Sequence, residues 1–184
     1  MEDEGLRMKD ERPICIGKGV CLREGKDMAV LSIGAIGNAV AEAIDLLEEG
    51  LKTQDKRPNS SDSKDSETKV ISPSSFILHP SSNESSSYHI AHYDMRWLKP
   101  LDEELLREVG ERFKTIVTVE DGVIDGGLGS AVLEWMADHG FTPRVIRLGV
   151  RDRFVEHGST QELYHLLKLD KEGICESLLQ ALEK

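Results

Sequence analysis

A short apolar run that leads into an amphipathic segment opens the predicted fold. The run is MAVLSIG, residues 28–34, and its continuous apolar character with a terminal glycine is typical of a buried strand. The next segment carries apolar side chains at helical spacing: Val40, Ala43, Ile44 and Leu47. Gly50 is a suitable C′ residue for that helix. A strand that leads directly into a helix predicts the beginning of a βαβ unit.

A second strand and helix are predicted after residue 88. Residues 89–98, HIAHYDMRWL, have the apolar and aromatic character of a strand. Asp102 is expected to cap the helix that follows, and Leu101 and Leu106 occupy the N′ and N4 positions of a hydrophobic staple. The alternation of strand and helix therefore continues.

Two more strands are predicted in the second half of the chain. Residues 115–120, TIVTVE, are rich in β-branched side chains. A glycine-rich turn separates them from a helix that carries Val132, Leu133 and Met136. Residues 143–150, PRVIRLGV, predict a further strand.

Two helices are predicted near the end of the chain. Ser159 followed by Glu162 three residues later has the pattern of a capping box, so a short helix should begin there. The final segment places Ile174, Leu178 and Leu182 on one face, as expected of an amphipathic helix that packs against a sheet.

This alternation predicts a single α/β domain that spans residues 1–184. Because parallel strands are joined through helices, we expect three layers, with a mostly parallel sheet and helices on both of its faces. Residues 18–27, KGVCLREGKD, predict a short edge strand and a turn before the first buried strand.

One long segment interrupts the alternation. The sequence contains 12 serines between Thr53 and Tyr88, and residues 52–88 have the composition of a low-complexity segment. Helix-to-strand connections usually take about 2–6 residues. We therefore expect residues 52–88 to be an insertion in the domain, either disordered or lying on the surface as a loop.

Composition and charge narrow the classes of function. The formal net charge of −11, without a basic stripe, disfavours a nucleic-acid partner. No apolar run approaches the roughly 18–20 residues that span a bilayer, and the charged N-terminus lacks the apolar region of a signal peptide. We therefore expect a cytoplasmic protein without a membrane partner. The three cysteines match no zinc motif and are expected to be reduced thiols.

The stretch 118–135, TVEDGVIDGGLGSAVLEW, is the strongest candidate site by position. In an open α/β sheet, ligands bind beyond the carboxyl ends of the strands, and Glu120 and Asp121 lie at such an end. Gly126, Gly127 and Gly129 allow close approach to the backbone, and the helix that follows offers free N–H groups to an anion.

Three interpretations of this turn stay open on spacing alone. It has neither the dinucleotide fingerprint nor the lysine of a Walker loop, and Glu120, Asp121 and Asp125 place negative charge where a phosphate would lie. A glycine-rich turn that lets strand and helix pack closely is the structural alternative. A carboxylate-lined contact with a partner or a metal is the third.

A second group of polar residues lies in RDRFVEHGS, residues 151–159. Asp152, Glu156 and His157 are candidates for general acid and base groups, although a histidine before Gly-Ser can equally form a hydrogen-bonded hinge before a helix. His89 and His92 are three residues apart on a predicted strand. They should point to opposite faces, so we expect no shared site for them.

Four segments, in this order, carry a resemblance to a known family: IGKGVCLREGKDMAVLSIG, YDMRWLKPLDEELL, TVEDGVIDGGLGSAVLEW and RDRFVEHGSTQELYHLLKLDKEGI. The chain resembles the C-terminal domain of the 1-deoxy-D-xylulose-5-phosphate synthase family, which is transketolase-like and depends on thiamine diphosphate. The resemblance covers nearly all of the chain outside residues 53–88 and the first dozen residues. The long insertion is a departure from the family, whose connection at this place is short.

The resemblance implies an activity for the complete enzyme. Members of the family condense pyruvate with glyceraldehyde 3-phosphate, release carbon dioxide and make 1-deoxy-D-xylulose 5-phosphate, a precursor of isoprenoids, thiamine and pyridoxal. Two upstream domains hold thiamine diphosphate and Mg²⁺, and EDGVIDGG only imitates their metal motif. The resemblance therefore implies no catalytic, cofactor-binding or metal-binding residue in this chain, and we expect it to be inactive alone.

The same resemblance implies that this domain packs against the two thiamine-binding domains, in the same or a separate chain, and contributes to a homodimer. Its matching motif positions and the adjoining acids are expected to face that assembly: Glu120, Asp121, Gly126, Gly127, Gly129, Ser130, Asp152, Glu156, His157 and Gly158. Two other hypotheses stay open at this point. One is a free-standing binding or assembly module, and the other is a small independent enzyme that uses Glu120, Asp121 and His157.

Overall fold

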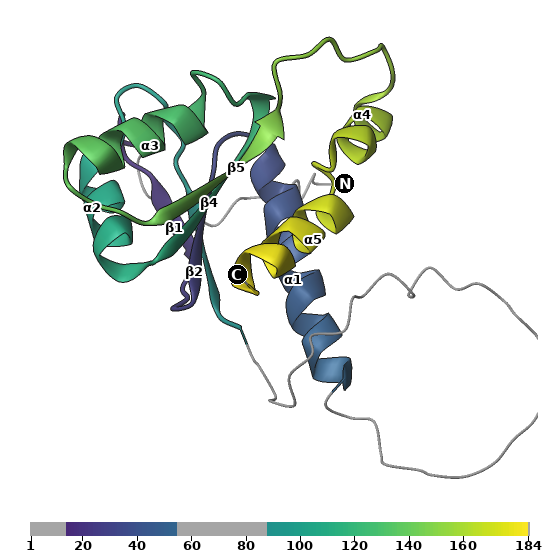
Figure 1. The fold of residues 1–184 in the computed structure, drawn as a ribbon, viewed down its shortest axis with the longest axis horizontal. Helices are drawn as coiled ribbons and strands as arrows, with labels where there is room; N and C mark the ends of the chain where they lie inside the picture. The colour runs from purple at the N-terminus through teal and green to yellow at the C-terminus, as the bar shows by residue number, and fades with distance from the viewer. Residues whose placement is uncertain (1–13, 55–87, 184) are drawn as a thin grey trace, which may run out of the picture.

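Residues 14–54 and 88–183 are described by the structure, a computed structural model, and their strands form one five-stranded sheet (Figure 1). The strands are β1 (Val20–Arg23), β2 (Met28–Ser32), β3 (Ile90–Asp94), β4 (Thr115–Val123) and β5 (Arg144–Val150). Their order in the sheet is β1-β3-β2-β4-β5, and only β1 runs antiparallel to its neighbour. The predicted α/β class with a mostly parallel sheet is confirmed.

Helices cover both faces of this sheet, so the predicted three layers are confirmed. On one face lie α1 (Ile36–Gln54) and α5 (Lys171–Leu182), and on the other lie α2 (Glu103–Arg112) and α3 (Leu128–Asp138) (Figure 1). The short helix α4 (Thr160–Leu167) precedes α5 and packs partly against the same core as α1.

The central strand β2 explains why its sequence is an unbroken apolar run. All five of its residues are buried. Met28 and Val30 belong to the core beneath α1 and α5, whereas Ala29 and Leu31 belong to the core beneath α2 and α3. A strand covered on both faces needs apolar side chains at consecutive positions, because successive side chains point to opposite faces.

The prediction that Gly50 ends the first helix is wrong. Helix α1 continues through Gly50 to Gln54. Glycine inside a helix costs about 1 kcal/mol relative to alanine, and the residues after Gly50 include good helix formers, so the helix propagates through it. Helix α1 therefore extends into the first residues of the segment 52–88 that is predicted to be an insertion. Residues 55–87 lie outside the described part of the chain, so the character predicted for them stays a prediction.

Strand β3 is shorter than the predicted strand over residues 89–98. The N–H of Met95 still donates to the carbonyl of Ser32 at 2.8 Å, in continuation of the pairing with β2. The next residue, Arg96, has a φ of 56°, which lies in the left-handed region and cannot continue a strand. The aromatic residue Trp97 therefore belongs to a loop.

The predicted helix caps are present. The Asp102 carboxylate accepts the Leu105 N–H at 3.2 Å and also the Gly19 N–H at 3.0 Å, so the cap joins the N-terminus of α2 to the segment before β1. Leu106 is buried, and Leu101 packs against the same core, as expected for the hydrophobic staple. Ser159 and Glu162 form the predicted capping box of α4.

Candidate functional site

The turn between β4 and α3 is closed by a buried carboxylate. Glu120, in β4, is 5% exposed. Its Oε2 accepts the backbone N–H of Leu128 at 2.9 Å, and its Oε1 accepts that of Gly129 at 3.0 Å. Two of the N–H groups that begin α3 are therefore bonded within the chain, in the position where an anionic ligand would bind.

The glycines of the turn give room for neighbouring side chains or adopt a backbone angle that favours glycine. A Cβ on Gly127 would lie 2.0 Å from Oε2 of Glu120, so only glycine lets the carboxylate reach the helix. A Cβ on Gly129 would lie 2.7 Å from both the Thr118 hydroxyl and the Arg147 side chain. Gly126 has a φ of +81°, which glycine adopts without strain. The interpretation that the glycines allow close packing of strand and helix is confirmed for Gly127 and Gly129, whereas a Cβ on Gly126 would meet no atom within 4 Å.

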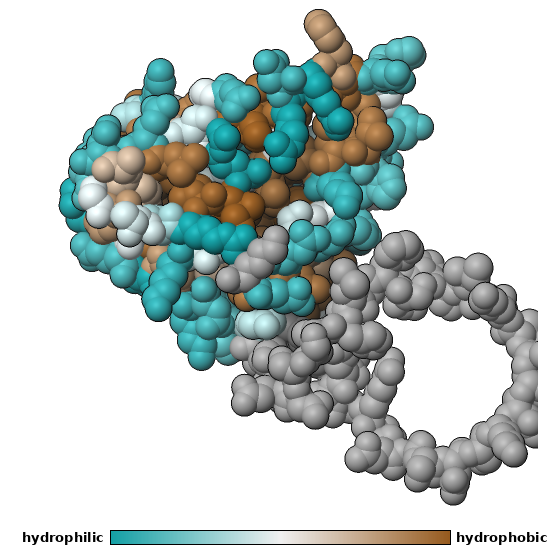
Figure 2. Space-filling view, in the orientation of Figure 1, coloured by the Kyte–Doolittle hydropathy of each residue, from teal (hydrophilic) through white to brown (hydrophobic). Residues whose placement is uncertain are grey.

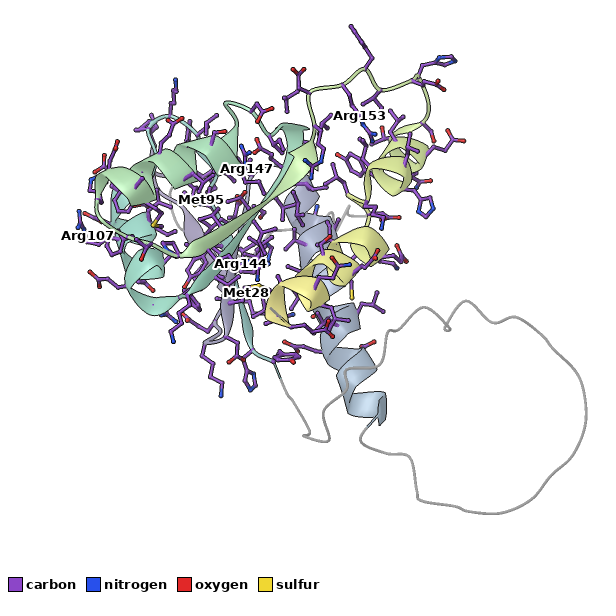
Figure 3. All side chains as sticks on the ribbon, in the orientation of Figure 1. Met28, Met95, Arg107, Arg144, Arg147 and Arg153 are labelled. Atoms are coloured by element: carbon purple, nitrogen blue, oxygen red, sulfur yellow. The ribbon has the colours of Figure 1, made fainter. Side chains whose placement is uncertain are left out.

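Arg147 of β5 holds the same turn from the neighbouring strand (Figure 3). Its Nη1 donates to the Ile124 carbonyl and to the Ser130 hydroxyl, both at 3.0 Å, and forms an ion pair with Asp125 at 3.5 Å. Ser130 in turn accepts the N–H of Gly126 at 3.0 Å. Sequence reasoning missed Arg147, and the one available signal was an arginine in the middle of an apolar strand.

The carboxylate of Asp121, the residue after Glu120, lies on the outside of the domain. Asp121 is exposed, and its carboxylate accepts the hydroxyl of Tyr164 in α4 at 3.2 Å. Partial burial, together with the nearby Asp121 carboxylate, raises the pKa of Tyr164. This bond fastens α4 to the end of β4. Nothing in the sequence pattern pairs these two residues, which are 43 positions apart.

The segment between β5 and α4 is exposed throughout, except for the half-buried Val155. Figure 1 shows it extending away from the sheet before the chain returns to α4. Asp152, Glu156, His157 and Gly158 all lie on it and are exposed, and Phe154 is 106% exposed. Within the described residues, no hydrogen bond or ion pair joins these groups to the β4–α3 turn. The structure therefore does not assemble Glu120, Asp121 and His157 into one site.

Two of the residues that were predicted to face the assembly are buried within the domain, and for them the prediction is corrected. Glu120 and Gly129 lie inside the domain, where the carboxylate bonds the start of α3 and the glycine packs against Thr118 and Arg147, so they are not available to a partner. Gly127 and Ser130 are half-buried and serve the turn itself. Asp121, Gly126 and the segment after β5 are exposed, and for them contact with a partner stays a prediction.

The two histidines near β3 do not share a site, as expected. His89 is exposed and precedes the strand, whereas His92 is 1% exposed inside it. The Nε2 of His92 and the hydroxyl of Ser32 are 2.8 Å apart, across neighbouring strands. Burial lowers the pKa of His92 from 6.5 to about 4, so its ring is neutral near pH 7. This pair is a polar contact inside the sheet that sequence reasoning did not find.

The turn between β4 and α3 does not fit a cofactor diphosphate. The most suitable anion site by position, at the start of α3, is filled by Glu120, and a second anion there would meet its negative charge. In residues 14–54 and 88–183, no three histidine, cysteine, aspartate or glutamate side chains gather as metal ligands. No helix of that part of the chain is long and apolar enough to cross a membrane. All three cysteines are free.

Comparison with known proteins identifies relatives over most of the chain. A family model for the transketolase C-terminal domain matches residues 84–174. The 1-deoxy-D-xylulose-5-phosphate synthase of Parabacteroides distasonis is 47% identical over 163 residues, which are 89% of this chain and 20% of that protein. The synthase of Bacteroides thetaiotaomicron is 45% identical over 92% of this chain and 21% of that protein. The chain thus spans about a fifth of the length of the curated relatives that it matches.

Solved structures show the same likeness. A split-gene transketolase, whose description reads "inactive beta4 tetramer", matches with a TM-score of 0.62 and 26% identity. The match covers 90% of this chain and 42% of that one. A transketolase from Pichia stipitis matches with a TM-score of 0.52 and 13% identity, over 90% of this chain and 18% of that one. The second match is a likeness of fold alone.

Proposed function

The chain belongs to the transketolase C-terminal domain family, in the form carried by 1-deoxy-D-xylulose-5-phosphate synthases, and we propose that it is the assembly domain of such a synthase. The observation that carries this proposal is the 47% identity over 163 residues with the synthase of Parabacteroides distasonis. The complete enzyme would condense pyruvate with glyceraldehyde 3-phosphate to 1-deoxy-D-xylulose 5-phosphate and carbon dioxide.

In this proposal the domain positions its neighbours and holds no cofactor. Thiamine diphosphate and Mg²⁺ belong to the two thiamine-binding domains of the synthase, where the cofactor supplies the carbanion chemistry. The closed start of α3 supports this division, because Glu120 occupies the place where a diphosphate would bind. The description of the split-gene transketolase tetramer as inactive supports the expectation that this domain is inactive alone. The complete enzyme is proposed to be a cytoplasmic homodimer.

The proposed contact surface is the exposed part of the predicted one. Asp121 lies at the end of β4, and Asp152, Glu156 and His157 lie beyond the end of β5. Because β4 and β5 are parallel, these residues lie near the carboxyl ends of neighbouring strands, at the same end of the sheet. The fully exposed Phe154 adds an apolar side chain that an isolated domain leaves in water.

A chimaeric enzyme tests this function. The part of the Parabacteroides distasonis synthase that this chain matches would be replaced by the chain, and the synthesis of 1-deoxy-D-xylulose 5-phosphate would be measured. We expect activity within about tenfold of the parent enzyme, because at 47% identity the chain should keep the backbone shape of the part that it replaces, and pre-organised interfaces change little on assembly. The parent enzyme without the matched part is the control and should be inactive.

The isolated chain supplies the second arm of the test. It should show no synthase activity and no Mg²⁺-dependent binding of thiamine diphosphate by calorimetry. Tight binding of the cofactor by the chain alone would contradict the proposed division of roles. An inactive chimaera that is folded and expressed as well as the parent would favour the free-standing binding module instead.

A further inference from the structure

The two edges of the sheet are built differently. Strand β1 has four residues, its pairing with β3 shifts register between Cys21 and Arg23, and Arg23 is tied to α1 through ion pairs with Asp45 and Glu48. Short, irregular and charged strands are how proteins block the edges of their sheets. Strand β5 has seven residues, and its register with β4 is regular from Arg144 to Leu148. Although it carries Arg144 and Arg147, it is neither short nor irregular over this stretch, so its backbone can pair with a further strand.

The backbone groups on the outer side of β5 can be assigned from the bonds on its inner side. The N–H of Arg144 donates to the Lys114 carbonyl at 2.8 Å, and the carbonyl of Val150 accepts the Ile124 N–H at 2.9 Å. Because backbone groups alternate in direction along a strand, those of the odd-numbered residues point away from β4: Val145, Arg147 and Gly149. Among the described residues, none forms a hydrogen bond with these outward backbone groups.

The side chains of β5 are only half covered. Ile146, Leu148 and Val150 pack against the core beneath α1 and α5 but are partly exposed, unlike the fully buried residues of β2. Figure 2 shows apolar surface over β5, between α3 and α5, bordered by hydrophilic side chains. A further strand beside β5 would cover this apolar surface and bond the outward backbone groups at the same time.

The charge around β5 indicates what kind of strand fits. The chain has a formal net charge of −11, yet residues 144–153 carry four arginines and a single acid. Three of these arginines, Arg144, Arg147 and Arg153, are labelled in Figure 3 on and just beyond β5. A second copy that paired β5 antiparallel about its centre would place Arg147 against Arg147, and like charges directly opposite destabilise a pair. An acidic segment would instead meet Arg151 and Arg153, which form no ion pair within the described part of the chain.

We propose that the free edge of β5 receives an extended, acidic segment from the thiamine-binding part of the synthase, which adds a sixth strand to the five-stranded sheet. This inference rests on the proposed function, because that function supplies the partner. The outward backbone groups give affinity, the half-covered Ile146 and Leu148 give apolar contact, and the flanking Arg151 and Arg153 select acidic side chains.

Amide hydrogen exchange tests the strand addition residue by residue. The probe is the thiamine-binding part of the Parabacteroides distasonis synthase, without the region that this chain matches, added to the full chain labelled with ¹⁵N. In the free chain, the N–H groups of Ile146 and Leu148 should exchange slowly, and those of Val145, Arg147 and Gly149 should exchange fast. In the complex all five should exchange slowly. The proposal would be overturned if the N–H groups of Val145, Arg147 and Gly149 exchanged as fast in the complex as in the free chain.

Matched proline variants test the same edge through affinity. Val145→Pro removes an outward N–H and leaves the bonds to β4 in place, so we expect the affinity for the probe to fall by about tenfold or more. Leu22→Pro, at the irregular position of β1 on the opposite edge, is the control and should leave the affinity unchanged. Circular dichroism would establish that both variants are folded.

A charge variant keeps the test independent of any folding defect. Arg151→Glu with Arg153→Glu alters two exposed side chains only, and it should also weaken binding, with the difference shrinking as salt is added. If the unmodified chain binds the probe and these variants bind equally well, the edge proposal fails while the proposed function stands. If the unmodified chain does not bind the probe at all, both fail.

Discussion

Gly127 and Glu120 are matched to each other, because a Cβ on Gly127 would lie 2.0 Å from Oε2 of Glu120. The missing side chain at one position lets the carboxylate at the other reach two backbone N–H groups of α3. Gly127 itself caps the helix without a side-chain hydrogen bond, so Glu120 performs the task that a Ser or Asp at the N-cap would perform. A loop that has the composition of an anion site is therefore an intramolecular cap.

Replacing Gly127 with alanine should destabilise the domain by about 2–4 kcal/mol, because the buried carboxylate must move and its two N–H partners lose their acceptor. The measurement is the free energy of unfolding in urea. Gly122→Ala is the control, since a Cβ there would meet Oε2 of Glu120 at 3.8 Å, an ordinary contact, and its effect should stay within about 0.5 kcal/mol. Equal effects of the two variants would contradict the matched fit.

Removing the carboxylate should create the anion site that the wild-type turn lacks. Glu120→Ala should lose about 1–3 kcal/mol, because buried N–H groups of Leu128 and Gly129 are left without an acceptor. Sodium formate should then raise the melting temperature of the variant more than that of the wild type, since formate replaces the missing carboxylate. Sodium chloride at equal ionic strength is the control. A formate effect that is the same for both proteins would argue against the cap.

The buried histidine predicts a loss of stability in mild acid. Burial lowers the pKa of His92 to about 4, below its value of 6.5 in an unfolded chain, although Asp94 opposes the shift. Between these values the unfolded state binds the additional proton, so stability falls as the pH drops from about 6.5 to 4, by up to about 3 kcal/mol.

The measurement for this prediction is the unfolding free energy in urea at several pH values for the wild type and for His92→Asn. The variant should be less stable near pH 7, and the difference from the wild type should shrink as the pH falls through this window. A constant difference between the two proteins would show that His92 does not titrate there.

The alternation of apolar runs and amphipathic segments was enough to predict the layers, the sheet class and most helix starts. These features depend on neighbouring residues: Asp102 caps α2 three residues before Leu105, and Ser159 caps α4 three residues before Glu162. Ends of elements were predicted less well. Gly50 continues a helix, and Arg96 ends a strand through a backbone angle that no local pattern indicates.

The chemistry of the candidate site could be predicted only in part, because its contacts join residues far apart in the sequence. The sequence placed Glu120 beside the glycines but could not show whether its carboxylate points inward to α3 or outward to solvent. That direction depends on the Gly127 contact and on Arg147 from the next strand. The bond between Ser32 and His92 crosses 60 positions and needs the parallel pairing of β2 with β3.

Arg147 and Ser130 should be energetically coupled, because the arginine donates to the serine hydroxyl at 3.0 Å and both hold the loop at Ile124. A double-mutant cycle with Arg147→Met and Ser130→Ala should give a coupling energy of about 0.5–1.5 kcal/mol in urea unfolding. Ser177→Ala is the matched control, since its hydroxyl bonds only the Gly173 carbonyl of its own helix. Its cycle with Arg147→Met should show additive effects.

Phe154 should matter for assembly and not for the stability of the isolated domain. Its side chain is 106% exposed, so Phe154→Ser removes no contact with the core and should change the unfolding free energy by less than about 0.5 kcal/mol. If the segment after β5 meets the thiamine-binding domains, an exposed aromatic side chain is a natural anchor, and its loss should weaken that complex by about tenfold. Ile14→Ser, at a residue 73% exposed before β1, is the control. Calorimetric titration with the thiamine-binding part of the Parabacteroides distasonis synthase measures both variants. Equal affinities would remove this segment from the contact surface, because a side chain buried in the complex cannot be deleted without loss of contact area.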